Sequence, residues 1–431
     1  MDILIIGNGG REHALGWKLG QSPLVDKIHI SPPEGADKEK SFVAGPEDPD
    51  NIRELINYLQ ENQIELVVIG PEVPLVNGLA DKLRAANILV FGPGAEAARL
   101  EGSKLFAKNF MQKQQIPTGN FAVCNNMEEV KSTLKKNPEF LVVKADGLAG
   151  GKGVGVFDKP GEVVEFSQSM FSGRFGNAGK KILLEEKLEG PELSVFLITD
   201  GKNYKMFSPS RDHKRLLDKN RGPNTGGMGA YTPINDLTEK QMDVIESEIL
   251  KPVVSGLAKE GIDYNGLLYV GLIMTSTGPK VLEFNCRFGD PETQPLMVHL
   301  DCDLLPWIFG VAKGKLPVNR ELQFKDGTSL TVVMASKGYP FSPEKGYLIE
   351  GLDEVKLIDN VKVFFAGCTD ENSQWITSGG RVLGVTAWGI NFEQAFQTAY
   401  EAVDKIKWPG VQYRKDIGKN IIDFNTTERK L

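Results

Sequence analysis

Three polar residues at alternate positions, Glu283, Asn285 and Arg287, form the pattern with the clearest chemical meaning in this sequence. Successive side chains on a β-strand point to opposite faces, so residues two apart share a face while the strand continues. Glu283 and Asn285 would then offer oxygen donors of the kind that Mg²⁺ prefers, and Arg287 could bind a phosphate or carboxylate in a bidentate fork. A polar strand face in water would show the same spacing, so the rest of the chain must decide.

A hairpin is expected to carry these residues. An apolar strand is predicted over 267–274, a turn over 276–279 and a returning strand over 280–285. Gly271 and Leu272 on the first strand supply no carboxylate. A metal ion held by Glu283 and Asn285 would therefore complete its shell with phosphate oxygens and water.

The composition of the 431-residue chain is that of an ordinary globular protein with roughly two to four domains. Its formal net charge of −7 argues against a general nucleic-acid-binding surface, so any phosphate site must be local. The amino-terminal apolar run is too short for a signal peptide, and no stretch approaches the ~18 apolar residues of a membrane span. The cysteines form no C-x-x-C pair, which argues against structural zinc and fits a reducing cytosol: Cys124, Cys286, Cys302 and Cys368. We therefore expect a cytoplasmic protein without nucleic-acid or membrane partners.

A possible phosphate-binding turn follows the apolar run at 2–6. Short apolar runs alternate with helical spacing over the first ~100 residues, which predicts a doubly wound α/β domain. Glu12 stands where a dinucleotide fingerprint needs its third glycine, so NAD binding is disfavoured. An anion could still bind at the helix amino terminus beside Arg11, although a purely structural turn explains the same glycines.

A second glycine-rich stretch, Asp146 to Val156, lies between two predicted strands and has lysines on either side. Its N–H groups could fold over phosphates, but Lys152 is followed by Gly153, so this is not a Walker A loop. A flexible hairpin with solvated lysines is the alternative. A predicted strand over 181–188 then leads to polar residues that could face a nucleotide or simply water.

A long loop is predicted over 222–231 because it is rich in Gly, Pro and Asn. Before it, His213 is either a general base or an ordinary surface histidine. Capped helices are predicted after Ser103, Thr238 and Asn391. Strands at 329–336, 362–367 and 381–387 together with the last of these helices predict a compact carboxy-terminal α+β domain.

Four of these stretches, 7–15, 144–149, 222–231 and 283–294, occur together in an order that resembles the phosphoribosylamine–glycine ligase (glycinamide ribonucleotide synthetase) family of the ATP-grasp superfamily. The resemblance runs nearly end to end. It implies that glycine is joined to the amine of 5-phosphoribosylamine, with ATP converted to ADP and phosphate through a glycyl phosphate, in de novo purine biosynthesis. It also implies an α/β domain at 1–102, an ATP-grasp domain at 103–316 with a mobile lobe around 120–190, and an α+β domain at 325–425.

The resemblance assigns roles to individual residues. Catalytic roles fall on Lys144, Asp212 and Arg287, and Mg²⁺ or Mn²⁺ ligation on Glu283 and Asn285. ATP contacts fall on Lys104, Lys144, Gly147, Gly150, Gly151, Glu185, Glu186, Leu188 and Glu192. Contacts to the small substrates fall on Gly9, Gly10, Arg11, Glu12, Pro71, Glu72, Asp212, Lys214, Asn224, Gly226, Met228 and Arg287.

One departure from the family pattern lies inside the proposed substrate region. Residues 216–221 read Leu-Leu-Asp-Lys-Asn-Arg, where the family usually carries a Gly-Asp-Gly-Asp-like run, so local substrate contacts stay open. The main alternative is another ATP-grasp ligase or carboxylase that acts on a purine-pathway ribonucleotide. A Rossmann dehydrogenase and a nucleotide-binding regulator without catalysis fit less well. A monomer is favoured over an oligomer.

Overall fold

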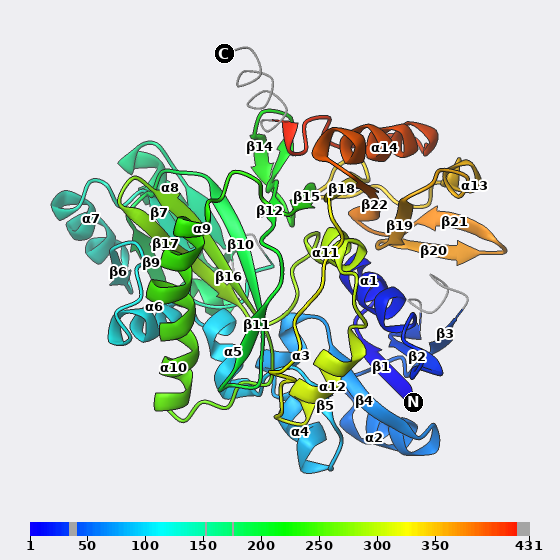
Figure 1. The fold of residues 1–431 in the computed structure, drawn as a ribbon. Coiled ribbons are helices and arrows are strands. Elements are labelled where there is room, and N and C mark those ends of the chain that lie inside the picture. The colour runs from blue at the N-terminus through cyan, green and yellow to red at the C-terminus, as the bar shows by residue number, and fades with distance from the viewer. Residues whose placement is uncertain (34–40, 151–152, 175, 420–431) are drawn as a thin grey trace.

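The amino-terminal strands form a parallel five-stranded sheet in the order β3-β2-β1-β4-β5 (Figure 1). The computed structural model describes residues 1–33, 41–150, 153–174 and 176–419. The apolar run in β1 is almost completely buried, as expected for a parallel strand covered on both faces. The doubly wound domain is therefore confirmed, with β1 (Asp2–Ile6), α1 (Gly10–Leu19), β2 (Lys27–Ser31), β3 (Phe42–Ala44), α2 (Ile52–Glu61), β4 (Ile64–Ile69), α3 (Glu72–Val76), α4 (Leu79–Ala85), β5 (Val90–Phe91) and α5 (Ala95–Gly102).

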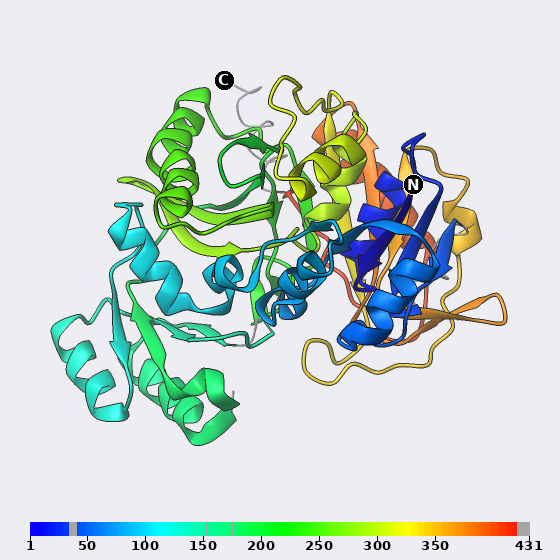
Figure 2. The same cartoon turned by 90° about the horizontal axis from the view of Figure 1, so that it is seen from below.

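A small lobe with its own hydrophobic core follows in the chain. Figure 2 shows it projecting from the rest of the molecule, with helices covering one face of an antiparallel sheet. The sheet order is β6-β9-β7-β8, so the strands on either side of the glycine-rich stretch are paired neighbours. The elements are β6 (Phe121–Cys124), α7 (Met127–Lys136), β7 (Val142–Ala145), β8 (Val154–Val156), α8 (Pro160–Ser169) and β9 (Ile182–Glu185).

A larger lobe holds the predicted hairpin in an antiparallel sheet of order β11-β10-β16-β17. The predicted caps are present: the Ser103 hydroxyl accepts a hydrogen bond from the Phe106 N–H, and Thr238 forms a capping box with Gln241. These interactions satisfy N–H groups that a helix start leaves unpaired. The elements are α6 (Lys104–Lys113), β10 (Glu192–Thr199), β11 (Tyr204–Met206), α9 (Glu239–Ile245), α10 (Lys251–Lys259), β16 (Gly266–Thr275) and β17 (Gly278–Asn285).

The carboxy-terminal sheet, in the order β12-β15-β18-β22-β19, includes strands from much earlier in the chain. Its elements are β12 (Arg211–Asp212), β15 (Gly229–Thr232), β18 (Thr328–Ala335), α13 (Leu352–Val355), β19 (Val361–Phe365), β20 (Cys368–Glu371), β21 (Gln374–Thr377), β22 (Arg381–Gly389) and α14 (Phe392–Lys405). Two further helices, α11 (Thr293–His299) and α12 (Leu305–Ala312), precede β18, and α11 packs against both α1 and β22. The carboxy-terminal α+β fold is thus confirmed, but its sheet also extends into the central part of the chain.

The prediction of one long loop over 222–231 is wrong, because both ends of this stretch are strands. β14 (Arg221–Asn224) pairs with β13 (Arg215–Leu217), and β15 finds its backbone partners on β18. A Cβ atom at Gly229 would lie 2.5 Å from the Thr331 carbonyl oxygen, so a glycine is needed for the close approach of these strands. β15 is a strand because it pairs with β18, which is distant in the sequence, so the local sequence pattern of β15 did not indicate a strand.

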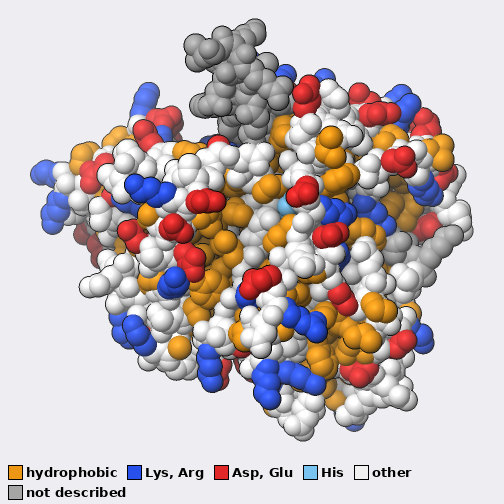
Figure 3. All heavy atoms as spheres, viewed as in Figure 1, with side chains coloured by type: hydrophobic (Ala, Val, Ile, Leu, Met, Phe, Trp, Pro, Cys, Tyr) orange, Lys and Arg blue, Asp and Glu red, His pale blue; other side chains and the backbone are white. Residues whose placement is uncertain are grey.

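Acidic and basic side chains are interspersed over the face shown in Figure 3, whereas nucleic-acid-binding surfaces gather basic ones. Among the described residues, no helix combines the length and the apolar character needed to cross a lipid bilayer.

Candidate active site

A cavity of about 260 Å³ lies where the two lobes and the amino-terminal domain meet. In the described part of the chain its lining comes from residues between Glu72 and Glu292, although the carboxy-terminal sheet lies close by. Of the predicted site residues, the cavity brings together Glu72, Lys104, Lys144, Gly150, Glu185, Asp212, Lys214, Asn224, Gly226, Glu283, Asn285 and Arg287.

The hairpin places Glu283 and Asn285 on the same side, facing the cavity, while Phe284 between them is buried in the core. β17 pairs antiparallel with β16, and Glu283 lies opposite Gly271. A Cβ atom on Gly271 would lie 3.3 Å from the Glu283 Cγ atom, so the absence of a side chain there gives the carboxylate room. The strand ends at Asn285, yet Arg287 still lines the cavity.

Arg287 is held on several sides by the protein itself. Its Nη2 donates to Glu101 Oε1 at 2.9 Å and its Nε to Glu72 Oε2 at 3.2 Å. Further bonds reach the Phe288 carbonyl oxygen at 3.2 Å and Asn285 Oδ1 at 3.3 Å. Burial disfavours the cation, but Glu101 and Glu72 outweigh burial and raise the pKa of Arg287, so the guanidinium stays charged in a fixed orientation.

Glu101 was missed by the sequence reasoning. One carboxylate oxygen holds Arg287, and the other accepts from the Cys286 N–H at 2.7 Å. Both contacts are to Cys286 and Arg287, which directly follow Glu283 and Asn285 in the chain, so Glu101 fixes the position of this segment. The sequence feature that could have indicated Glu101 is its position on the same face of α5 as the small apolar residues Ala97 and Ala98, which are buried with it.

Lysine ammonium groups gather at the small-lobe end of the cavity. Lys144 Nζ contacts Glu185 Oε2 at 3.0 Å and the Leu282 carbonyl oxygen at 3.0 Å. Lys108, which the sequence reasoning missed, reaches the same Glu185 oxygen at 2.8 Å. Lys104 donates to the Gly147 carbonyl oxygen at 3.1 Å. Burial lowers the pKa of Lys104 and of Lys108, as expected for cations gathered in a partly dry site.

The other oxygen of Glu185, Oε1, is buried without a hydrogen-bond partner in the described protein. An unpaired buried acceptor is costly, and a ligand N–H group in the cavity would satisfy it. The neighbouring glycine-rich stretch faces the same space: Gly150 adopts a left-handed conformation with φ +55°, and apart from its chain neighbours no described residue has an atom within 4 Å of a Cβ added to it. Gly151 and Lys152 lie outside the described residues.

Carboxylates gather at the opposite end of the cavity around Asp212 and Lys214. Lys214 Nζ lies 2.9 Å from Glu192 and 4.0 Å from Glu283. Burial raises the pKa of Asp212 to about 7, and the negative charges of Glu292, Glu192 and Glu283 add to the rise while Lys214 opposes it. A carboxyl group with this pKa can exchange a proton near neutral pH, which suits a general base.

Glu292 was also missed by the sequence reasoning. Its side chain lines the cavity and burial raises its pKa. Glu292 lies after β17 in a segment without regular secondary structure, so the sequence spacing could not predict which way its side chain points.

The structure corrects the reading of His213. Its ring is half-buried with the Nδ1 atom turned inward, its Nε2 atom accepts a hydrogen bond from the Gly418 N–H at 3.0 Å, and burial, reinforced by Arg414, lowers its pKa to about 3. His213 is thus unsuited to the suggested role of general base, and it is not a freely solvated surface residue either. It joins the segment at Asp212 to the end of the described chain.

Comparisons with known proteins give one consistent result. Family models of phosphoribosylglycinamide synthetase match residues 1–101 as the N domain, 102–293 as the ATP-grasp (A) domain and 329–420 as the C domain. The chain belongs to the phosphoribosylglycinamide synthetase family. A phosphoribosylamine–glycine ligase of Brucella melitensis is 44% identical over 432 residues, which cover 100% of both chains.

Solved structures agree with this membership. The phosphoribosylamine–glycine ligase of Thermotoga maritima superposes with a TM-score of 0.83 at 34% identity, over 97% of this chain and 100% of that one. A biotin carboxylase of Campylobacter jejuni reaches a TM-score of 0.73 over 96% of this chain and 92% of its own, but at 16% identity that similarity shows the fold alone. The ATP-grasp architecture expected for the family is confirmed.

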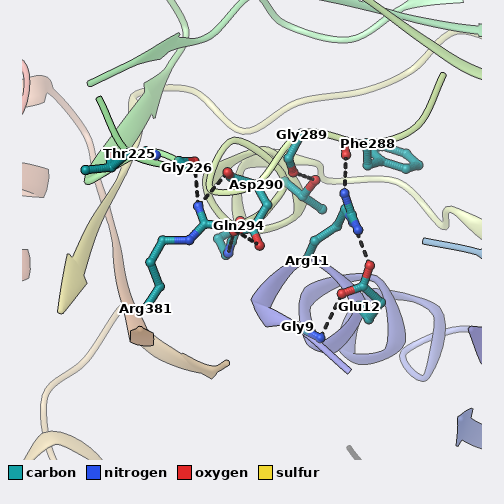
Figure 4. A network of polar contacts seen from close by, with 12 residues as sticks. Gly9, Arg11, Glu12, Thr225, Gly226, Phe288, Gly289, Asp290, Gln294 and Arg381 are labelled. Carbon is teal, nitrogen blue, oxygen red and sulfur yellow. Dashed lines mark hydrogen bonds and ion pairs between the residues drawn. The ribbon is translucent and has the colours of Figure 1, made fainter. Parts of the chain in front are cut away.

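The predicted phosphate-binding turn at Gly9–Glu12 lies outside the cavity lining, and its polar groups are bonded to other protein groups. Glu12 accepts from the Gly9 N–H at 2.8 Å and from Arg11 Nε at 2.6 Å, while Arg11 Nη1 donates to the Phe288 carbonyl oxygen at 3.1 Å (Figure 4). A Cβ atom at Gly10 would lie 2.7 Å from Gln294 Nε2. Glu12 is only 2% exposed, so its placement does not support a substrate contact.

Other family-implied contacts also lie outside the cavity. The placement of Met228 does not support a substrate contact, because its side chain is fully buried and its N–H and carbonyl groups bond His213 and Val333. Glu186 forms an ion pair with Lys280 at 2.8 Å. Gly147, Glu192 and Pro71 are next to lining residues without being part of the lining: the Gly147 carbonyl holds Lys104, Glu192 pairs with Lys214, and Pro71 is the N-cap of α3 and precedes Glu72. Leu188 lies beside Gly119 and is not in the lining either.

Glu283 and Asn285 fit a metal ion only with help from a ligand. Among the described residues, no cluster of three or more His, Cys, Asp or Glu side chains could hold a metal ion unaided. Burial opposes charge on Glu283, but Lys214, Lys144, Lys104 and Arg287 outweigh it and lower its pKa. The ionised carboxylate and the amide oxygen suit Mg²⁺ or Mn²⁺ that takes its other ligands from phosphate and water.

Proposed function

We propose that the chain joins glycine to the amine of 5-phosphoribosylamine and converts ATP to ADP and phosphate. The observation that supports this most strongly is a single cavity with lysines at one end and Asp212 with Lys214 at the other, joined by the Glu283 hairpin. Phosphoryl transfer and amide formation need such an arrangement, because most of the catalysis comes from positioning and charge stabilisation.

The nucleotide is placed at the small-lobe end. Lys104 and Lys144 lie where they can contact phosphate oxygens, and the described residues of the glycine-rich stretch, 148–150 and Gly153, offer N–H groups beside them. The unpaired Oε1 of Glu185 can accept a hydrogen bond from the adenine amino group. Lys108 then orients Glu185 by holding its other oxygen.

The first step forms an acyl phosphate. A carboxylate oxygen of glycine attacks the γ-phosphorus of ATP, and the bond to the ADP oxygen breaks. Mg²⁺ or Mn²⁺ bound by Glu283 and Asn285 would neutralise charge on the transferring phosphoryl group. Arg287 keeps its cation fixed beside the reacting groups; an arginine has five N–H donors, so one can still face a substrate oxygen.

The second step forms the amide. The amine of phosphoribosylamine attacks the glycyl carbonyl carbon, phosphate leaves with the oxygen that joined it to carbon, and the nitrogen loses a proton. Asp212 is the proposed acceptor of that proton, because its pKa of about 7 lets the ionised form take a proton near neutral pH. Lys214, Asn224 and Gly226 would hold the small substrates on this side.

An assay of ADP release with each substrate omitted in turn tests the proposal. Release should require ATP and glycine and should be fastest when phosphoribosylamine is also present. Release that is unchanged without glycine, or that is restored by bicarbonate in place of glycine, would contradict the assignment and favour a carboxylase. The cytoplasmic location and the monomeric state stay predictions.

A further inference from the structure

The hairpin β13–β14 carries cavity residues at its base but has little support of its own. In the described part of the chain the two strands pair only with each other, and most of the turn between them is exposed. An isolated two-stranded hairpin is marginally stable in water. Lys214 directly precedes β13 and Asn224 ends β14, so any movement of the hairpin moves this wall of the cavity.

The segment Arg414–Gly418, near the end of the described chain, contacts this hairpin along its length; we name this segment the clamp. Figure 1 shows β14 beside the last described residues of the chain, which are coloured red. Arg414 Nη1 donates to the Arg215 carbonyl oxygen at 3.2 Å and to Asn220 Oδ1 at 2.9 Å. Arg414 is 1% exposed, which is unusual for an arginine and shows how closely the two segments pack.

Backbone groups complete the contact. Asp416 pairs with Arg414 through both oxygens, at 2.7 and 2.9 Å, and also accepts from the Lys219 N–H at 2.7 Å. The Lys415 N–H donates to Asp218 Oδ1 at 2.8 Å, and the Gly418 N–H donates to His213 at 3.0 Å. The hairpin is therefore held at its tip, at the first residue of β13 and just before that strand.

We infer that Arg414 is a positioning residue that holds Lys214 and Asn224 in place for the small substrates. The inference rests on the proposed function for its kinetic consequence, although the contact itself does not. Arg414 does not line the cavity, so it acts through the hairpin. The divergent residues at 216–221 also gain a role, because Asp218, Lys219 and Asn220 all bond the clamp.

The test compares Arg414→Met with Lys415→Met in the full-length protein. Lys415 is the matched control, because its side chain is exposed and it contacts the hairpin through its backbone N–H. Hydrogen exchange should become faster over 215–224 in Arg414→Met, with little change in β18 or β22, and should stay as in the wild type in Lys415→Met. In Arg414→Met, KM for glycine or phosphoribosylamine should rise about tenfold or more, because misplaced substrate-holding groups weaken binding of these substrates. KM for ATP should stay nearly unchanged in this variant.

Arg414→Lys should recover part of the effect because it keeps the charge but loses the bidentate geometry. If Arg414→Met does not fold, Asn220→Ala at the exposed tip removes one clamp contact and should increase exchange in the same residues. Unchanged exchange over 215–224, or an equal rise in KM for ATP, would overturn the inference. Wild-type protein without glycine-dependent ADP release would refute the proposed function instead, and the exchange measurement would still decide on the clamp.

Discussion

The proton-accepting role of Asp212 predicts a pH profile. With a pKa of about 7 in place of the ordinary 3.8, the ionised fraction should rise from about 9% at pH 6 to about 91% at pH 8. The ratio kcat/KM reports ionisations of the free enzyme, so it should increase about tenfold over this interval with an acid limb near pH 7. With the ordinary pKa the ionised fraction would change by less than about 1% over the same interval.

Two variants separate this limb from titration of the substrate amine. Lys214 lowers the pKa of Asp212, so Lys214→Met should move the limb to higher pH. Glu292 raises it, so Glu292→Gln should move the limb to lower pH. The rate of ADP release is measured from pH 5.5 to about 9 in constant-ionic-strength buffers, because screening would otherwise change these interactions. A limb that stays in place in both variants refutes the reasoning about Asp212.

Three other predictions concern the site and its frame. Glu283→Gln should raise the Mg²⁺ concentration needed for half-maximal ADP release at fixed ATP, and an unchanged requirement would remove Glu283 as a ligand. Arg381→Met removes bonds to the Gly226 and Asp290 carbonyl oxygens at 2.6 and 2.7 Å and an ion pair with Asp290 at 3.0 Å, and both interactions with Asp290 are partly buried (Figure 4). It should therefore lower the free energy of unfolding in urea by about 2–4 kcal/mol, and a loss below about 0.5 kcal/mol would contradict this. The raised pKa of Asp212 makes its ionised form destabilising in the folded state above pH 7, whereas below pH 4 the group is protonated and carries no such cost. Asp212→Asn should therefore raise Tm above that of the wild type at pH 8 by more than it does at pH 4. An equal change in Tm at both pH values would contradict this prediction.

Local periodicity was enough to predict much of this protein. The alternation at Glu283 and Asn285, the buried run of β1 and the caps at Ser103 and Thr238 each depend on neighbours within a few residues, and the structure has them as expected. The same holds for the alternation of strands and helices that indicated the first domain.

Residues whose role depends on distant partners could not be predicted in this way. Glu101 and Lys108 meet their partners, Arg287 and Glu185, only in the folded chain. β15 becomes a strand because β18 pairs with it, and a sequence rich in glycine and asparagine gave no sign of this. Family resemblance indicated which segments form the site, but it could not indicate that the side chain of Met228 is fully buried.

The central claim, that ATP activates the carboxylate of glycine, can be followed atom by atom. Glycine labelled with ¹⁸O in its carboxylate is incubated with the enzyme, ATP and phosphoribosylamine, and the inorganic phosphate is analysed by mass. If glycyl phosphate forms, the bridging oxygen comes from glycine and leaves with phosphate when the amine attacks, so each phosphate released should contain one labelled oxygen. Unlabelled phosphate formed together with the amide product would contradict the account.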